Sequence, residues 1–188
     1  VGANVWMLYT WLPDLLRERF QLPMAQASLV ATSSIEVSMF VGLILGAFAG
    51  DRLAVRRPVA RLYLMCGGLG IACASFFFIA AGSTLAEVQA AVISYAVFKG
   101  FYTANYIACI FEVVPIRARA FSVGVVNMTS AIGGSVSPYL LGALKPVYGT
   151  VGVFGGISVF GVTTALTLTI LGLRRFKKDQ ENQQLACL

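Results

Sequence analysis

The chain has 188 residues, of which 58% are hydrophobic and 12% are charged. An ordinary soluble domain carries about 25% charged residues, so this chain has too few charges to cover a surface exposed to water. Its hydrophobicity excludes an intrinsically disordered protein. Four cysteines in a chain of this length also exclude a small secreted scaffold built on disulfide bonds. The composition therefore predicts an integral membrane protein.

Long stretches with few or no charges follow one another along the sequence, and a membrane helix needs about 20 apolar residues. We predict an all-α membrane bundle over residues 1–173 and a basic and polar tail over residues 174–188. The first span is too short to cross a bilayer and lacks the features of a signal peptide, so we expect it to be the outer part of a helix that begins upstream of Val1. The chain is thus expected to be a fragment. The predicted spans cover residues of about 1–16, 24–50, 60–82, 88–111, 120–144 and 147–173.

The basic residues predict the orientation of this bundle. The segments that follow the second, fourth and last predicted helices hold ten of the fourteen Lys and Arg residues. These segments are two helices apart, so they lie on one side of the membrane, and the positive-inside rule places that side in the cytoplasm. We expect a multi-pass protein of the inner (plasma) membrane with a cytoplasmic C-terminus. The net charge of +6 then follows from topology, and no nucleic-acid partner is needed to explain it.

The residue patterns of most catalytic and metal sites are missing from the sequence. It contains no histidine, which removes imidazole metal ligands and a Ser-His-Asp triad. The cysteines have no CxxC spacing, and no GxxxxGK[ST] loop is present to bind a nucleotide phosphate. We therefore predict no enzyme activity, no metal site and no cofactor.

Polar residues inside the helix at 88–111 mark a candidate binding face. Lys99, Tyr95, Tyr102 and Tyr106, together with Cys109, recur with helical spacing and fall within an arc of about 80°. Lys99 lies at the middle of this span, where a charge costs about 2.5–3.5 kcal/mol on insertion scales. It should therefore face protein or water, either in a structural ion pair or along a water-filled path that admits a small molecule.

Polar residues on two further helices predict that such a path is shared. Asn127 and Ser130 lie on one face of the helix at 120–144, and Glu36 is the single charge within residues 24–50. A carboxylate at this depth is poorly solvated and favours its protonated form, which suits a proton carrier. We predict that Glu36 couples proton movement, and that the substrate-binding residues are Lys99, Tyr95, Tyr102, Tyr106, Asn127 and Ser130.

Three segments of the sequence resemble one known family. The segment Gly46-Ala-Phe-Ala-Gly-Asp51-Arg52-Leu-Ala-Val-Arg56-Arg57 resembles the signature loop G-x-x-x-D-R-x-G-x-R-R of the major facilitator superfamily, although alanines stand where glycines are usual. That departure is commoner in the second copy of the motif, between helices 8 and 9. Glu112 and Arg119 resemble the ends of the E-x6-R element after helix 10. Residues 127–139 are similar to helix 11 of the organic-anion and sugar-phosphate permeases, the anion:cation symporter group.

The resemblance covers essentially the whole chain and implies a six-helix half, with its first helix truncated, of a twelve-helix transporter that works by alternating access. It implies the C-terminal half, from late helix 7 to helix 12, with the missing N-terminal half and membrane lipid as partners. Together with Lys99 it favours secondary transport of a small organic anion, such as a sugar acid or a carboxylate, coupled to an ion such as the proton. It also implies a cytoplasmic gate, for which we predict Asp51, Arg52, Arg56, Glu112 and Arg119.

Several alternatives stay open at this point. The arginines of the signature loop could serve topology alone, and Lys99 could merely neutralise Glu36. Rows of glycines such as Gly42, Gly46 and Gly50 pack helices closely, either within the chain or in a dimer. The chain could also be the N-terminal half, a membrane scaffold or receptor that transports nothing, or an intramembrane enzyme built on Ser and Lys.

Overall fold

The computed structural model describes the backbone of residues 2–55 and 59–186, and the side chains of residues 4–55, 59–149 and 151–172. All regular elements in these ranges are helices, which confirms the predicted all-α class. They are α1 (Gly2–Phe20), α2 (Met24–Ala54), α3 (Ala60–Ala81), α4 (Leu85–Val113), a short 3-10 helix, η1 (Ile116–Ala118), and α5 (Arg119–Ala186).

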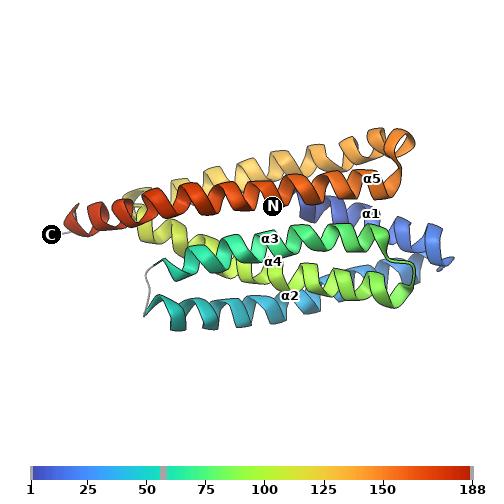
Figure 1. Ribbon diagram of the computed structural model, residues 1–188, viewed down its shortest axis with the longest axis horizontal. Coiled ribbons are helices and arrows are strands. Elements are labelled where there is room, and N and C mark those ends of the chain that lie inside the picture. The colour runs from blue at the N-terminus through green and yellow to red at the C-terminus, as the bar shows by residue number, and fades with distance from the viewer. Residues whose placement is uncertain (1, 56–58, 187–188) are drawn as a thin grey trace.

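The element α5 consists of two antiparallel arms that meet at Gly149 (Figure 1). Gly149 has φ 66° and ψ 169°, a conformation that reverses the chain and that glycine adopts without a steric penalty. The predicted boundary between the two spans lies at residues 144–147, and the chain reverses two residues later, at Gly149. Pro146 lies inside the helical stretch before the reversal.

The ends of the helices gather at two opposite ends of an elongated bundle (Figure 1). One end, here called the basic end, contains the C-terminus of α2, the start of α3, the junction of α4 with α5, and the C-terminus. The far end contains the C-terminus of α1, the α3–α4 loop and the Gly149 reversal. The first residues of α1 lie near the middle of the bundle, so α1 covers only the half toward the far end (Figure 1). This arrangement brings the basic segments together, as the topology prediction requires.

Three helical stretches in the described residues are long and apolar enough to cross a membrane: α2, α3 and Val151–Gly172 of α5. The helix α4 is of similar length but carries Lys99, Asn105 and three tyrosines along its course. The chain is accordingly a multi-pass membrane protein, and α4 carries a lysine at its centre. The core between the helices is apolar, and its largest fully buried side chains include Met7, Leu8, Leu12, Ile35, Phe76, Ile79 and Phe154.

A row of glycines on α2 makes close contact with α4. A Cβ atom built on Gly42 would collide with the carbonyl oxygen of Val97, and one built on Gly46 would lie 2.6 Å from the Cα atom of Phe101. Gly50 in turn faces the side chain of Asn105. Small residues allow this approach in membrane proteins, where dispersion contacts and hydrogen bonds drive helix association. Packing within the chain is therefore confirmed as the use of this row.

We expect Gly46→Ala to lower the thermal midpoint of the purified protein in detergent, because the added methyl group meets the backbone of α4. Overpacking of this kind typically destabilises by about 1–3 kcal/mol. Gly67→Ala is the matched control, since a Cβ atom at Gly67 on α3 has nothing within 4 Å. An unchanged or raised midpoint for both variants would show that α2 and α4 are not packed through Gly46.

Candidate functional site

Lys99 lies at the middle of α4 and carries a cation that has no anionic partner among the described side chains. Its Nζ atom is 2.9 Å from the Sδ atom of Met39 on α2, and a thioether sulfur is only a weak acceptor. The ion pairs among the described side chains all belong to other residues. The Lys99 side chain is half-buried. Its ammonium group is therefore available to an anion that enters from outside this bundle.

Glu36 lies on α2, one helical turn before Met39, and so on the same side of the helix as the residue that Lys99 contacts. The hydroxyl of Tyr9 on α1 donates a hydrogen bond to its Oε1 atom. Among the described groups, Glu36 is the carboxylate whose charge acts on Lys99. We call Tyr9, Glu36, Met39 and Lys99 the charged face. Glu36 is exposed in this bundle, and a carboxylate at this depth must meet water or protein because lipid solvates it poorly.

The three predicted tyrosines of α4 lie in different surroundings. Tyr95 is 2% exposed, and its ring packs edge-on against Phe76 with 5.0 Å between the centroids. Its hydroxyl makes no hydrogen bond within the part of the chain that the structure describes. Tyr102 and Tyr106 are half-buried and stack on each other with centroids 5.4 Å apart. Tyr95 thus points into the core, while Tyr102 and Tyr106 remain partly accessible further along α4, where Tyr102 packs against Leu69, Cys73 and Ala165 of α3 and α5.

Asn127 and Ser130 lie on the first arm of α5. Asn127 is exposed and Ser130 is half-buried. Neither side chain is joined by a hydrogen bond to Lys99 or Glu36 among the described residues. The structure therefore leaves these two polar groups open but does not bring them into the charged face.

The basic end contains a three-residue ion-pair cluster that joins α2, α3 and α4. The Nη2 atom of Arg61 is 2.7 Å from Oδ1 of Asp51, and its Nε atom is 3.4 Å from Oε1 of Glu112. Sequence reasoning predicted both acids but treated Arg61 only as a topology charge. Its position in the first turn of the helix after Asp51 was the available signal.

The other predicted gate residues make different contacts. Arg52 is exposed and lies over the ring of Phe48 at 5.7 Å. Arg119 donates hydrogen bonds to the carbonyl oxygens of Phe111 and Val114, at 2.8 and 3.3 Å. It thereby satisfies the last carbonyls of α4, where a cation also interacts favourably with the helix dipole. Arg56 lies outside the described residues. Of the five predicted gate residues, Asp51 and Glu112 are brought together.

Glu112 is the incompletely compensated member of this cluster. It lies beyond the span predicted for α4, and desolvation raises its pKa while the Arg61 guanidinium opposes that rise. Its Oε2 atom is buried without a hydrogen-bond partner in the described part. A raised carboxyl pKa means that the folded state binds the proton more tightly than the unfolded state does. The associated stability is present below the ordinary pKa of glutamate and is lost as the pH rises through the raised value. At neutral pH the ionised form of Glu112 is therefore less favourable in the folded cluster than in the unfolded chain.

Two basic residues fasten α1 at the far end. Arg19 donates hydrogen bonds to the carbonyl oxygens of Ala80 and Gly82, at 2.9 and 2.7 Å, and so satisfies the C-terminus of α3. Lys145 on α5 lies 3.0 Å from Glu18 and 3.6 Å from Asp14 of α1. These partners could not be predicted from the sequence, because they come from helices that are distant along the chain. These contacts fix α1 against α3 and α5.

Asn105 is a second residue that sequence reasoning missed. It is 2% exposed, and its Nδ2 atom donates to the carbonyl oxygens of Gly46 and Phe101, at 3.1 and 2.9 Å. It therefore ties α4 to the glycine row of α2. Asn105 lies four residues after Phe101, and the glycines that these two residues face on α2 are also four residues apart. This shared spacing was the signal available in the sequence.

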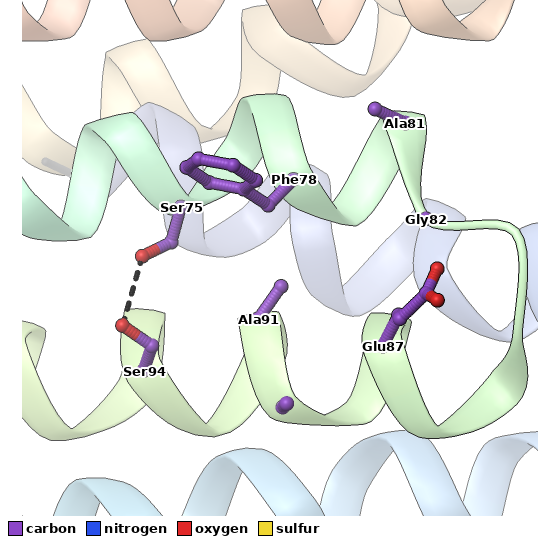
Figure 2. Close-up of a pocket in the computed structure, with 8 residues that line it drawn as sticks. Ser75, Phe78, Ala81, Gly82, Glu87, Ala91 and Ser94 are labelled. Carbon is purple, nitrogen blue, oxygen red and sulfur yellow. Dashed lines mark hydrogen bonds between the residues drawn. The ribbon is translucent and has the colours of Figure 1, made fainter.

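A groove of about 460 Å³ lies between α3 and α4 toward the far end (Figure 2). Ser75 and Ser94 hydrogen-bond to each other across it at 3.1 Å. Glu87 lies at its other end, where the carboxylate accepts the backbone N–H groups of Ser83 and Thr84, at 2.7 and 3.3 Å. These bonds complete the N-terminal cap of α4 and lower the pKa of Glu87. Because its polar groups are occupied in holding the helices, we assign this groove a structural role.

The chemistry that the charged face offers is non-covalent. It combines an ammonium, a carboxylate and a phenol from three helices at mid-depth. No group of three or more Cys, Asp and Glu residues in the described ranges is placed to hold a metal ion. Such a face can bind an ionic solute and exchange protons with it.

Comparison with known proteins gives the family. The family model of the Major Facilitator Superfamily matches residues 1–186. A search of curated proteins finds no significant match. The family match extends over nearly all of the sequence and agrees with the helical bundle and with the signature segment that contains Asp51 and Arg52. The chain therefore belongs to the Major Facilitator Superfamily.

Proposed function

We propose that this chain is the C-terminal half of a secondary transporter that moves a small organic anion by alternating access, coupled to the proton. Secondary transport is the general function of the family to which the chain belongs. The observation that carries the anion assignment is Lys99, a mid-bundle cation whose polar contact is a thioether rather than a carboxylate.

The missing N-terminal half would complete the binding site. In this arrangement the charged face lies between the two halves near the middle of the membrane, where transporters of this kind bind their solutes. Water and the second half would solvate Glu36 and Lys99, which lipid cannot do. Tyr102, Tyr106, Asn127 and Ser130 would supply neutral hydrogen-bonding groups around the solute. The solute class that we propose is a sugar acid or a carboxylate, as in the organic-anion permeases, in the inner membrane with the C-terminus in the cytoplasm.

The basic-end cluster of Asp51, Arg61 and Glu112 supports a role as the cytoplasmic gate. It joins three helices through one guanidinium group, and the burial of Glu112 opposes its ionised form. The free energy needed to open such a cluster is therefore small. Arg52, Arg56 and Arg119 then add basic charge that orients the chain.

We expect Glu36→Gln to weaken the pH dependence of net anion uptake by the complete protein in proteoliposomes while sparing anion exchange. Net symport must carry a proton across the membrane, whereas exchange moves no net protons. Glu18→Gln at the far end is the control, because it makes the same chemical change away from the charged face. If Glu36→Gln retained the wild-type pH dependence of uptake, Glu36 would not be the coupling group.

A further inference from the structure

We infer that Tyr9 is a positioning residue that holds the carboxylate of Glu36 away from Lys99, and so sets how strongly the binding of an anion to Lys99 and of a proton to Glu36 favour each other. This inference rests on the proposed function, since it explains how the two sites of the charged face would be coupled. It concerns α1, which carries none of the residues predicted from the sequence to bind substrate or proton.

The two charges are close but separately partnered. Glu36 accepts a hydrogen bond from the phenol of Tyr9. Lys99 donates to Met39, which lies one turn of α2 beyond Glu36. Residues at this spacing have Cβ atoms about 5–6 Å apart on one helix face. Lys99 can therefore reach Glu36 by a change of side-chain rotamer, without movement of α2 or α4.

An ion pair between Glu36 and Lys99 is the competing arrangement. Opposite charges attract strongly where the dielectric constant is low, whereas a phenol and a thioether are neutral partners. Two titratable groups on the helices packed against α2 interact electrostatically with Glu36. They are Tyr9 of α1 and Lys99 of α4. Between Leu62 and Ala81, α3 carries no charged residue. The balance between the two arrangements is thus set by Tyr9 and Met39.

This competition couples the two ligands thermodynamically. When Glu36 pairs with Lys99, neither group is free for its ligand. An anion on Lys99 releases Glu36 to take a proton, and a proton on Glu36 removes the charge that competes for Lys99. Each ligand therefore raises the affinity for the other by the same factor, as linkage requires. Tyr9 can hydrogen-bond Glu36 in both protonation states, since its hydroxyl both donates and accepts.

The attachment of α1 makes this coupling sensitive to helix motion. Arg19 and Lys145 bind α1 to α3 and α5 at the far end, and Trp11 donates to the carbonyl oxygen of Pro138 at 3.2 Å. Tyr9 therefore moves with α3 and α5. Rotation of these helices relative to α2 would separate Tyr9 from Glu36 and permit the ion pair with Lys99.

Carbodiimide cross-linking tests this inference without knowledge of the substrate. A membrane-permeant carbodiimide activates a carboxyl group, and a neighbouring amine displaces the activated oxygen to form an amide, with release of the urea. Peptide mass spectrometry of the complete protein in proteoliposomes then measures the amide between Glu36 and Lys99. We expect Tyr9→Phe to raise the yield about fivefold or more over wild type in alkaline buffer, within the range of typical coupling energies.

The pH profile separates positioning from a structural role. A carboxyl group that has taken up a proton no longer attracts Lys99, so the ratio of Tyr9→Phe to wild type should fall toward one as the buffer is made acid. General loosening of the bundle would raise the yield at every pH. Tyr63→Phe on α3 is the matched control, because Tyr63 is 54% exposed and lies outside the charged face. Glu36→Gln should give no product and verifies the assignment of the amide.

A second variant keeps the test decisive if Tyr9→Phe folds poorly. Met39→Leu removes the sulfur that Lys99 contacts and should also raise the alkaline yield, with the same loss of effect in acid. Wild-type yield in the folded variants, or a raised yield that does not depend on pH, would overturn the inference. Because cross-linking needs no solute, this outcome is distinct from a failure of anion transport, which would overturn the proposed function instead.

Discussion

Replacing Lys99 by glutamine should weaken the apparent affinity of the complete transporter for its anionic solute by at least about tenfold, which corresponds to 1.4 kcal/mol. Glutamine retains hydrogen-bonding capacity but removes the point charge. The ammonium contacts Met39 and no carboxylate in the described part, so the loss reports on the anion and not on a broken ion pair. Water in the cavity limits the attraction to a few kcal/mol. Competition for uptake into proteoliposomes measures this affinity.

Controls for this variant come from the chain itself. Lys145→Gln removes the same charge at the far end, where Lys145 pairs with Glu18, and should leave the affinity largely unchanged. Lys99→Arg should rescue only in part, because a planar guanidinium does not occupy the space of an ammonium. If Lys99 served only to neutralise Glu36, the double variant Lys99→Gln with Glu36→Gln would recover both yield and affinity. That recovery would rule out contact between Lys99 and the solute.

Replacing Arg61 by glutamine should open the basic end. The substitution leaves Asp51 without its cation and Glu112 partly buried with an uncompensated charge. Loss of a charged hydrogen bond of this kind is worth about 1.5–3 kcal/mol. Cys109 is buried one turn before Glu112 and packs with Leu62 and Cys66, so its reaction with a maleimide reports on opening. We expect its labelling rate to rise by about tenfold or more, following the conversion of 1.4 kcal/mol per factor of ten.

Arg52→Gln is the matched control for that measurement. Arg52 lies in the predicted signature loop and carries the same charge, but it contacts Phe48 and neither acid. We expect wild-type labelling for this variant. Wild-type labelling of Arg61→Gln as well would show that the arginines act on topology alone.

The sequence was sufficient to predict the class and the general arrangement of this fold. Uncharged stretches of membrane length predicted the helices, and the alternation of basic segments predicted which helix ends lie together (Figure 1). The glycine row at Gly42, Gly46 and Gly50 predicted a close helix contact. These features depend on composition and periodicity along single helices, which the sequence shows directly.

The partners between helices could not be predicted in the same way. Tyr95 and Lys99 lie on the same arc of α4. Positions on that arc are nevertheless far enough apart around the helix axis to face different neighbouring helices. Tyr95 consequently packs on Phe76 of α3, while Lys99 reaches Met39 of α2. Arg61 was missed for a related reason, because its acids lie on two other helices. Such pairings depend on how the helices are rotated about their axes, which periodicity does not determine.

Anion counterflow tests the central claim most directly. Proteoliposomes that contain the complete protein are loaded with an unlabelled sugar acid or carboxylate, and a trace of the same labelled anion is added outside. The account predicts transient accumulation of label that depends on the protein, is abolished by Lys99→Gln at low anion concentration and is preserved in Glu36→Gln. Counterflow of neutral or cationic solutes, with none for any organic anion of the panel, would contradict it.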